Sequence, residues 1–192
     1  MVARDFLAQR ERDPGYQAMR AAKDRELAER AEQRQQEQKP LLDDLAAIGV
    51  VVDSISHLCR MPRTSEQVFA VLLHHLQRPY SPHMLEWIGR AFGTRSARPF
   101  VWNDLVALLK THALEEAAAD GVMTAISEIA QPRDLETLID LITDRSLGSR
   151  RIFLVQNLMR SRRPEARAIL LRLQDDTDLA GEITTRLRRS RR

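Results

Sequence analysis

The sequence predicts an all-α protein in which antiparallel helix pairs stack along the chain as an α-α solenoid. Three observations support this: an apolar stripe with helical spacing at residues 132–144, the recurrence of that pattern at a nearly constant interval, and a composition poor in strand and turn formers. Aromatic residues make up 5% of the 192 positions and there are 7 glycines, which suits a helical stack better than a β protein.

The segment 132–144 shows the helical pattern most clearly. Its apolar residues fall at i, i+3, i+4 and i+7, the spacing that places side chains on one face of a helix: Leu135, Leu138, Ile139 and Ile142. Pro132 suits the first turn, where a missing N–H costs no hydrogen bond. The segment is therefore predicted to form one amphipathic helix.

An adjacent apolar pair recurs along the chain at intervals of 33, 33 and 32 residues, beginning at Leu72, Leu105, Leu138 and Leu170. Prolines keep the same step, at Pro99, Pro132 and Pro164. A second apolar segment precedes each proline, over residues 84–92, 122–129 and 152–158. Two helices per fixed period indicate a solenoid, in which neighbouring units supply each other's core.

These units resemble the HEAT-like helical repeats, especially their short bacterial form. The resemblance rests on Ala125-Ile-Ser-Glu-Ile-Ala130, followed by Pro132, Leu135, Leu138-Ile139, Leu141-Ile142 and Asp144, and it covers roughly residues 50–190. It implies a right-handed solenoid related to armadillo-type arrays. It also implies a protein that binds partners along continuous helical faces.

Two regions are expected along the chain. Residues 1–39 are predicted to form a charged N-terminal helical arm, and residues 40–192 the solenoid, with Pro40 as the boundary. A short helix should end at Gly49, and residues 50–58 are predicted as the next helix despite three valines. The remaining helices are expected at 65–77, 82–93, 100–112, 115–130, 133–143, 149–160, 164–175 and 178–189.

The arm is rich in good helix formers but has a thin apolar face, made mainly by Tyr16, Met19 and Leu27. One interpretation is a solvated helix that frays or lies on its own array. The other is a helix that docks on a partner or on a second copy of the chain. The sequence leaves both open.

The net charge of +3 is unevenly distributed. Residues 1–39 carry +1, residues 40–144 carry −6, and residues 145–192 carry +8, with arginine as the only basic residue type in this last segment. The segment Leu147-Gly148-Ser149-Arg150-Arg151 places two guanidinium groups at a predicted helix start, where cations are disfavoured. They need either a carboxylate of a neighbouring unit, with Asp120, Asp140 and Asp144 as candidates, or an anionic ligand.

No catalytic or metal-binding pattern emerges. Cys59 is the single cysteine, the five histidines include no His-x-x-x-His pair, and Gly-rich phosphate loops and nucleophile motifs are missing. Trp87 and Trp102 fall on apolar helix faces and are expected in the core more than on a ligand platform. The chain is therefore expected to be no enzyme and to need no cofactor or metal.

The N-terminus lacks an apolar stretch of signal-peptide length, and the longest apolar run, residues 45–52, is too short to cross a bilayer. With its lone cysteine, the chain is expected to be cytoplasmic and not to enter a membrane.

The predicted function is a protein-binding scaffold. Its expected partner-binding residues are Arg145, Arg150, Arg151, Arg162, Arg163, Tyr16 and Met19. One alternative is nucleic-acid binding through the arginine-rich C-terminal repeats, prompted by the similarity to HEAT-like DNA glycosylases. Another is a toxin-neutralising protein of the immunity or antitoxin type, whose arm wraps its target.

Overall fold

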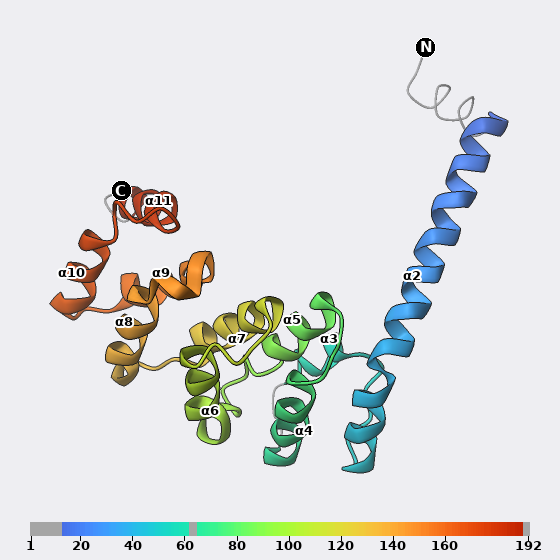
Figure 1. The fold of residues 1–192 in the computed structure, drawn as a ribbon, viewed down its shortest axis with the longest axis horizontal. Helices are drawn as coiled ribbons and strands as arrows, with labels where there is room; N and C mark the ends of the chain where they lie inside the picture. The colour runs from blue at the N-terminus through green and yellow to red at the C-terminus, as the bar shows by residue number, and fades with distance from the viewer. Residues whose placement is uncertain (1–12, 62–64, 190–192) are drawn as a thin grey trace. The chain divides into compact units, whose positions relative to one another are not determined.

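The protein is all-helical. Its structure, a computed structural model, describes residues 13–61 and 65–189, and in this part of the chain 76% of residues are helical and none lies in a strand. The predicted fold class is thereby confirmed as all-α (Figure 1). Contacts divide the chain into two units, Met1–Pro40 and Leu41–Arg192, which are described separately.

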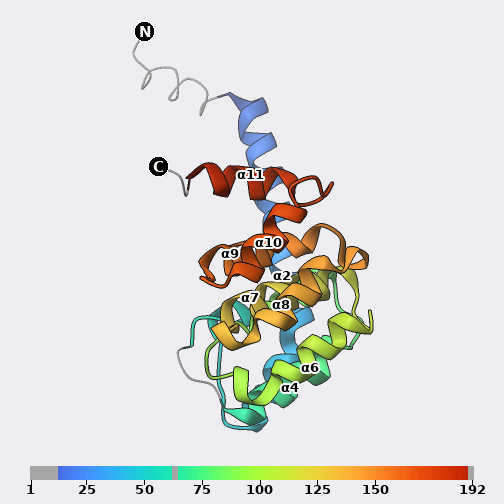
Figure 2. The ribbon, with the colours of Figure 1, turned by 90° about the vertical axis from the view of Figure 1, so that its left-hand side faces the viewer.

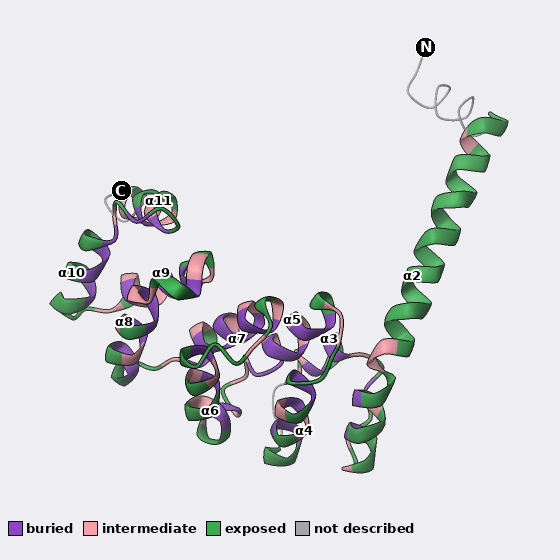
Figure 3. Cartoon of the chain, viewed as in Figure 1, coloured by how far each residue is buried: buried purple, intermediate pink, exposed green. Residues whose placement is uncertain are grey.

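The first unit consists, where it is described, of the greater part of helix α2 (Pro14–Ala47). Asp13 starts this helix by accepting a hydrogen bond from the Gly15 N–H at 2.8 Å. Almost every side chain of the segment is exposed, as Figure 3 shows in green. The thin apolar face that the sequence indicates therefore covers no core of its own.

The sequence predicts a separate short helix after Pro40 that ends at Gly49, and this prediction is wrong. Helix α2 continues through Pro40 to Ala47. A proline inside a helix removes one N–H donor but does not forbid continuation. The last turns are held instead by the fully buried Leu41 and Leu45, which belong to the second unit.

The helix predicted over residues 50–58 is largely absent. Only α3 (Ile55–Leu58) forms there, with Ser54 accepting a hydrogen bond from the His57 N–H at 3.4 Å. The three preceding valines are not helical. Gly49 stops α2 in the left-handed region at φ 81°, and β-branched side chains do little to restart a helix.

The rest of the second unit follows the predicted helix pattern closely. It contains α4 (Glu66–Leu76), α5 (Pro82–Arg90), α6 (Arg98–Lys110), α7 (Glu116–Ile129), α8 (Leu135–Thr143), α9 (Ile152–Arg160), α10 (Pro164–Arg172) and α11 (Ala180–Arg189). Two 3-10 helices, η1 (Pro132–Asp134) and η2 (Arg145–Arg151), precede α8 and α9. Figure 2 shows these helices following one another from α4 and α6 to α11.

Contacts between helices alternate along the second unit. Helix α5 packs against α7, α7 against α9, and α9 against α11, while α4 contacts α6 and α8 contacts α10. The apolar side chains between them form one core cluster, drawn in purple in Figure 3. Each helix thus contacts its neighbour in sequence or the helix after it, so the turns of successive pairs come close together.

The prolines of the repeat begin helices as predicted. Pro99, Pro132 and Pro164 each occupy the first or second position of α6, η1 and α10. Ser81 caps α5, since its hydroxyl accepts a hydrogen bond from the Met84 N–H at 3.3 Å. These residues fix where each pair turns, and three of these turns border the surface described next.

Candidate partner-binding groove

A groove of about 750 Å³ runs across three successive turns of the second unit. The first turn, between α5 and α6, contributes Arg95 and Arg98. The turn from α7 into α8 contributes residues 127–132 with Leu135 and Leu138, and the turn from α9 into α10 contributes Asn157 and residues 160–163. The repeat of the chain therefore brings residues from three helix pairs to one surface.

The middle turn is held by a reciprocal cap. The Asp134 carboxylate accepts a hydrogen bond from the Gln131 N–H at 2.7 Å, and the Gln131 side chain caps the start of η1 in return. This arrangement satisfies backbone donors that the helix itself leaves unpaired. Residues 130–132 therefore have a fixed path along the groove.

Two side chains tie the outer turns to the middle one. The Arg98 guanidinium donates to Asp134 Oδ1 at 2.7 Å, and these two side chains are only 10% and 9% exposed. The Asn157 amide donates to the Ser127 carbonyl oxygen at 2.8 Å. Both contacts are buried or partly buried, so the groove is built on rigid supports.

Four of the arginines that line the groove have no ion-pair partner among the described residues. The guanidinium groups of Arg95, Arg160, Arg162 and Arg163 are exposed and make no ion pair with any described residue. Arg98, by contrast, is neutralised by Asp134. The groove therefore presents uncompensated positive charge at its first and third turns.

Glu128 is the one acid among the described residues that line the groove, and it belongs to the middle turn. Burial raises the pKa of its carboxyl, and the nearby Arg90 guanidinium opposes that rise. Arg90 itself is bound to Glu86 by two hydrogen bonds, at 2.7 and 3.0 Å. The carboxyl of Glu128 lies over Gly93, where a Cβ would collide with it.

The arginines at residues 145–151 have a different role from the one predicted for them. Arg151 is 1% exposed, and its guanidinium bonds to Asp176 at 3.0 and 3.1 Å and to Asp178 at 2.7 Å. A buried, fully paired group cannot contact a partner, so the assignment of Arg151 to a binding surface is corrected. This pairing was not among the carboxylates that the sequence suggested.

Arg150 is also satisfied inside the protein. Its guanidinium donates to Asp120 at 2.7 Å and lies 3.8 Å from Glu116, and its side chain is 14% exposed. Asp120 was one of the predicted carboxylate partners. The carboxylate interpretation of Arg150 is therefore confirmed, and the residue offers little to a ligand.

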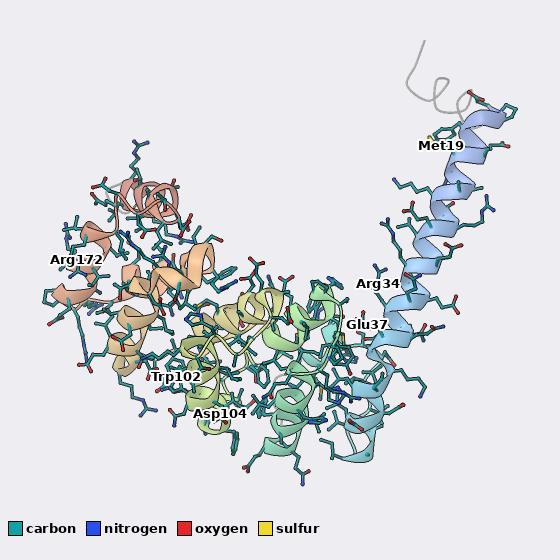
Figure 4. The ribbon with its side chains drawn as sticks, viewed as in Figure 1. Met19, Arg34, Glu37, Trp102, Asp104 and Arg172 are labelled. Atoms are coloured by element: carbon teal, nitrogen blue, oxygen red, sulfur yellow. The ribbon has the colours of Figure 1, made fainter. Side chains whose placement is uncertain are left out.

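The remaining predicted binding residues are scattered. Arg162 and Arg163 line the groove, whereas Arg145 is 84% exposed and lies 3.8 Å from Asp176. Tyr16 and Met19 belong to the first unit, where Met19 is 58% exposed on the surface of α2 (Figure 4). The tail residues Arg191 and Arg192 lie outside the described residues.

Arg95, Arg160 and Glu128 were missed in the sequence. A usable signal existed, because each lies beside the proline that begins a second helix, at Pro99, Pro132 or Pro164. In a stacked array such equivalent positions come together. The prediction relied on runs of adjacent arginines and did not compare equivalent positions of successive repeats.

The described residues show no other recognised site. No group of three or more His, Cys, Asp or Glu side chains in residues 13–61 and 65–189 could hold a metal ion. None of the described helices is both long and apolar enough to span a bilayer. Trp87 and Trp102 pack partly buried against the core, where the Arg98 guanidinium lies 4.3 Å from the Trp102 ring centre.

The sequence matches no protein-family model, and comparisons with curated proteins and with solved structures also gave no match. Any function assigned to this chain must therefore rest on its own geometry.

Proposed function

We propose that this chain is a non-catalytic scaffold that binds a protein partner in the groove across its helix-pair turns. The observation that carries the proposal is the groove itself, with four arginines that form no ion pair with residues 13–61 or 65–189. Charged groups that are satisfied internally stabilise the fold. Groups held without a partner on a rigid concave surface are the ones that suit recognition.

We further propose that the helix pairs stack as a right-handed, HEAT-like solenoid. Side-chain contacts between residues thirty positions apart support this: Asn157 with Ser127, Arg150 with Asp120, and Lys110 with Asp140 at 3.0 Å. A constant separation of this kind is what stacked repeats produce. Such arrays bind partners on continuous faces, and this step is an argument from architecture.

The test is affinity capture from a cell lysate with the full-length chain and two matched variants. The groove variant R160A/R162A/R163A removes three unpaired charges, and the control variant R167A/R172A/R188A removes three exposed arginines outside the groove. Figure 4 labels Arg172 of the control set on α10. We expect one discrete protein to be captured by the wild type and the control and to be lost from the groove variant.

Equal loss from both triple variants would mean that charge alone, and not the groove, holds the captured protein. Capture that survives in the groove variant would place the binding surface elsewhere. Far-UV circular dichroism and thermal unfolding of each variant show whether its fold is intact. Exposed, unpaired arginines contribute little to stability, so both variants should fold.

Nucleic-acid binding is a second candidate, favoured by one observation. Six arginines of residues 160–188 are exposed and form no ion pair with the described residues: Arg160, Arg162, Arg163, Arg167, Arg172 and Arg188. Such groups neutralise phosphates, and the resulting affinity falls steeply with salt. Gel retardation with duplex and single-stranded DNA at low salt tests this, and an absence of any shift would exclude it. In the capture experiment, loss of the captured material after nuclease treatment of the lysate would favour it.

A toxin-neutralising role remains a specific form of the scaffold proposal in which the arm also contacts the target. The exposed apolar residues Met19 and Leu27 of α2 are the arm's best contacts. The variant M19E/L27E should lose the captured protein only if the arm binds it. An unchanged capture would restrict the contact to the second unit.

A further inference from the structure

We propose that the groove recognises an extended, acidic segment of a protein partner, with two anionic ends separated by a short uncharged centre. This inference rests on the proposed scaffold function and names the chemistry of its ligand. The argument uses the order of charges along the groove, its floor and its length.

The order of charges is positive, negative, positive. Arg95 stands at the first turn, Glu128 at the middle turn, and Arg160, Arg162 and Arg163 at the third. None of these arginines pairs with a described acid. A complementary ligand therefore carries carboxylates at both ends and none at its centre.

The floor between the charged turns is uncharged apart from Glu128. Its apolar members are Ala130 and Pro132, with Ile129, Leu135 and Leu138 almost buried behind them, and its polar members are Ser127, Gln131 and Asn157. No aromatic side chain lines the groove among the described residues. Single-stranded nucleic acids are usually held by stacking on aromatic rings, so this floor suits a peptide side chain better than a base.

The length of the groove sets the spacing of the ligand charges. Packed helices lie about 8–10 Å apart, which puts the first and third turns of the row α5, α7, α9 about 16–20 Å apart. An extended chain covers about 3.3–3.6 Å per residue. The two acidic ends are therefore about five residues apart in sequence, with about four uncharged residues between them.

Glu128 then acts as a selectivity residue. Its carboxyl is the only acid among the described residues that line the groove. Glu128 is exposed, yet a carboxylate bound at the middle turn would still lie beside a second carboxylate, and like charges a few ångströms apart repel near a protein surface. The groove should thus reject a uniformly acidic segment in favour of one with an uncharged centre.

The experiment measures fluorescence anisotropy of labelled synthetic peptides with the full-length protein at low ionic strength. The reference peptide has an acidic pair at each end and four uncharged residues between them, including one leucine. The comparison peptides have a two-residue centre, an acidic centre, or lysine in place of the acids. We expect the reference peptide to bind best and the lysine peptide not to bind.

The protein variants separate the groove from general charge. The variants R160A/R162A/R163A and R95A should each lower the affinity for the reference peptide at least tenfold. The control R167A/R172A/R188A should change that affinity less than threefold. The variant E128Q should raise the affinity for the acidic-centre peptide at least fivefold and leave the affinity for the reference peptide within twofold of the wild type. Raising salt to physiological strength should weaken all of these complexes.

Three results would overturn the inference: equal weakening by the groove and control triples, no preference for the longer centre, or tighter binding of a single-stranded oligonucleotide that displaces the peptide. Failure of the scaffold proposal looks different. If the captured protein is retained by the groove variant while the peptides bind as expected, the groove ligand stands and the scaffold surface lies elsewhere. If capture depends on the groove but no acidic peptide binds, the scaffold stands and this ligand chemistry is wrong.

Discussion

Gly89 of α5 packs directly against Gly121 of α7. A Cβ added to Gly89 would lie 2.7 Å from the Val122 nitrogen and 2.8 Å from the Gly121 Cα, and one added to Gly121 would lie still closer to the Glu86 carbonyl oxygen. The two helices therefore touch backbone to backbone. This contact sets the distance between the first two turns that border the groove.

Replacing Gly121 by alanine should destabilise the protein by about 1–3 kcal/mol, because the obstructing atoms belong to backbone and cannot swing aside. Urea denaturation followed by circular dichroism measures the change. Gly181 of α11 is the matched control, since nothing lies within 4 Å of its Cβ position. Gly181 is the second residue of α11, so G181A should leave the free energy of unfolding unchanged or raise it by less than about 0.5 kcal/mol. A neutral G121A would show that the two helices can separate freely.

Replacing Arg151 by alanine should lower the free energy of unfolding by about 3–5 kcal/mol, because Asp176 would be left charged and buried without its partner. R151A is compared with R145A, whose side chain is 84% exposed and which should leave the urea midpoint nearly unchanged. R151K should recover only part of the loss, since an ammonium cannot form the paired bonds that a guanidinium makes. Similar midpoints for R151A and R145A would contradict this role.

The same pair predicts an acid-sensitive step. Hydrogen bonds from Arg151 lower the pKa of the Asp176 carboxyl. A carboxyl with a lowered pKa adds stability above its ordinary value of about 3.9, and that stability is lost as the pH falls through the lowered pKa. Unfolding of the wild type should therefore become easier below about pH 4. In D176N this step should be smaller, and a step of unchanged size would assign it to other acids.

His75 predicts a separate step at milder pH. It is fully buried, with Nε2 2.8 Å from Asp44 and Nδ1 2.6 Å from the Tyr80 hydroxyl. Burial lowers the pKa of His75, and the hydrogen bond to Asp44 opposes this. The unfolded chain then binds a proton more readily, so stability should fall as the pH drops below about 6.5.

The His75 step is measured by urea denaturation between pH 7.5 and pH 5.5. H75Q should be less stable at pH 7.5, because a buried network is broken, but should respond less to acidification. His74 is its exposed neighbour, and H74Q should keep the wild-type response. An equal response in H75Q and the wild type would place the sensitive group elsewhere.

Substitutions of Arg98 and Arg95 should affect the stability of the protein differently, although both residues line the groove. R98A should lower the free energy of unfolding by about 3 kcal/mol, because it leaves the buried Asp134 carboxylate without its ion-pair partner and loosens the middle turn. R95A removes an exposed side chain that forms no ion pair with the described residues, so the melting temperature should barely change. Thermal unfolding of the two variants side by side provides the measurement. A large loss in R95A would reveal a structural role for that arginine.

The sequence alone determined the helices from α4 to α11 and the places where their pairs turn. Apolar spacing around Leu138 and the prolines at positions 99, 132 and 164 are local signals, and local signals are enough for a helix and its first turn. The sequence failed at Pro40 and at the three valines. There the outcome depended on which side chains were buried by distant parts of the chain, such as Leu41 and Leu45.

Only the tertiary structure decided which arginines are free to contact a ligand. Arg150 and Arg151 look like an exposed basic pair in the sequence, yet both are used internally, by Asp120 and by Asp176. Arg160 and Arg163, which lie in a similar run, find no partner among the described residues. The pairing energy of a charge depends on the distance and burial of groups about thirty residues away, and spacing along one helix carries no information on either.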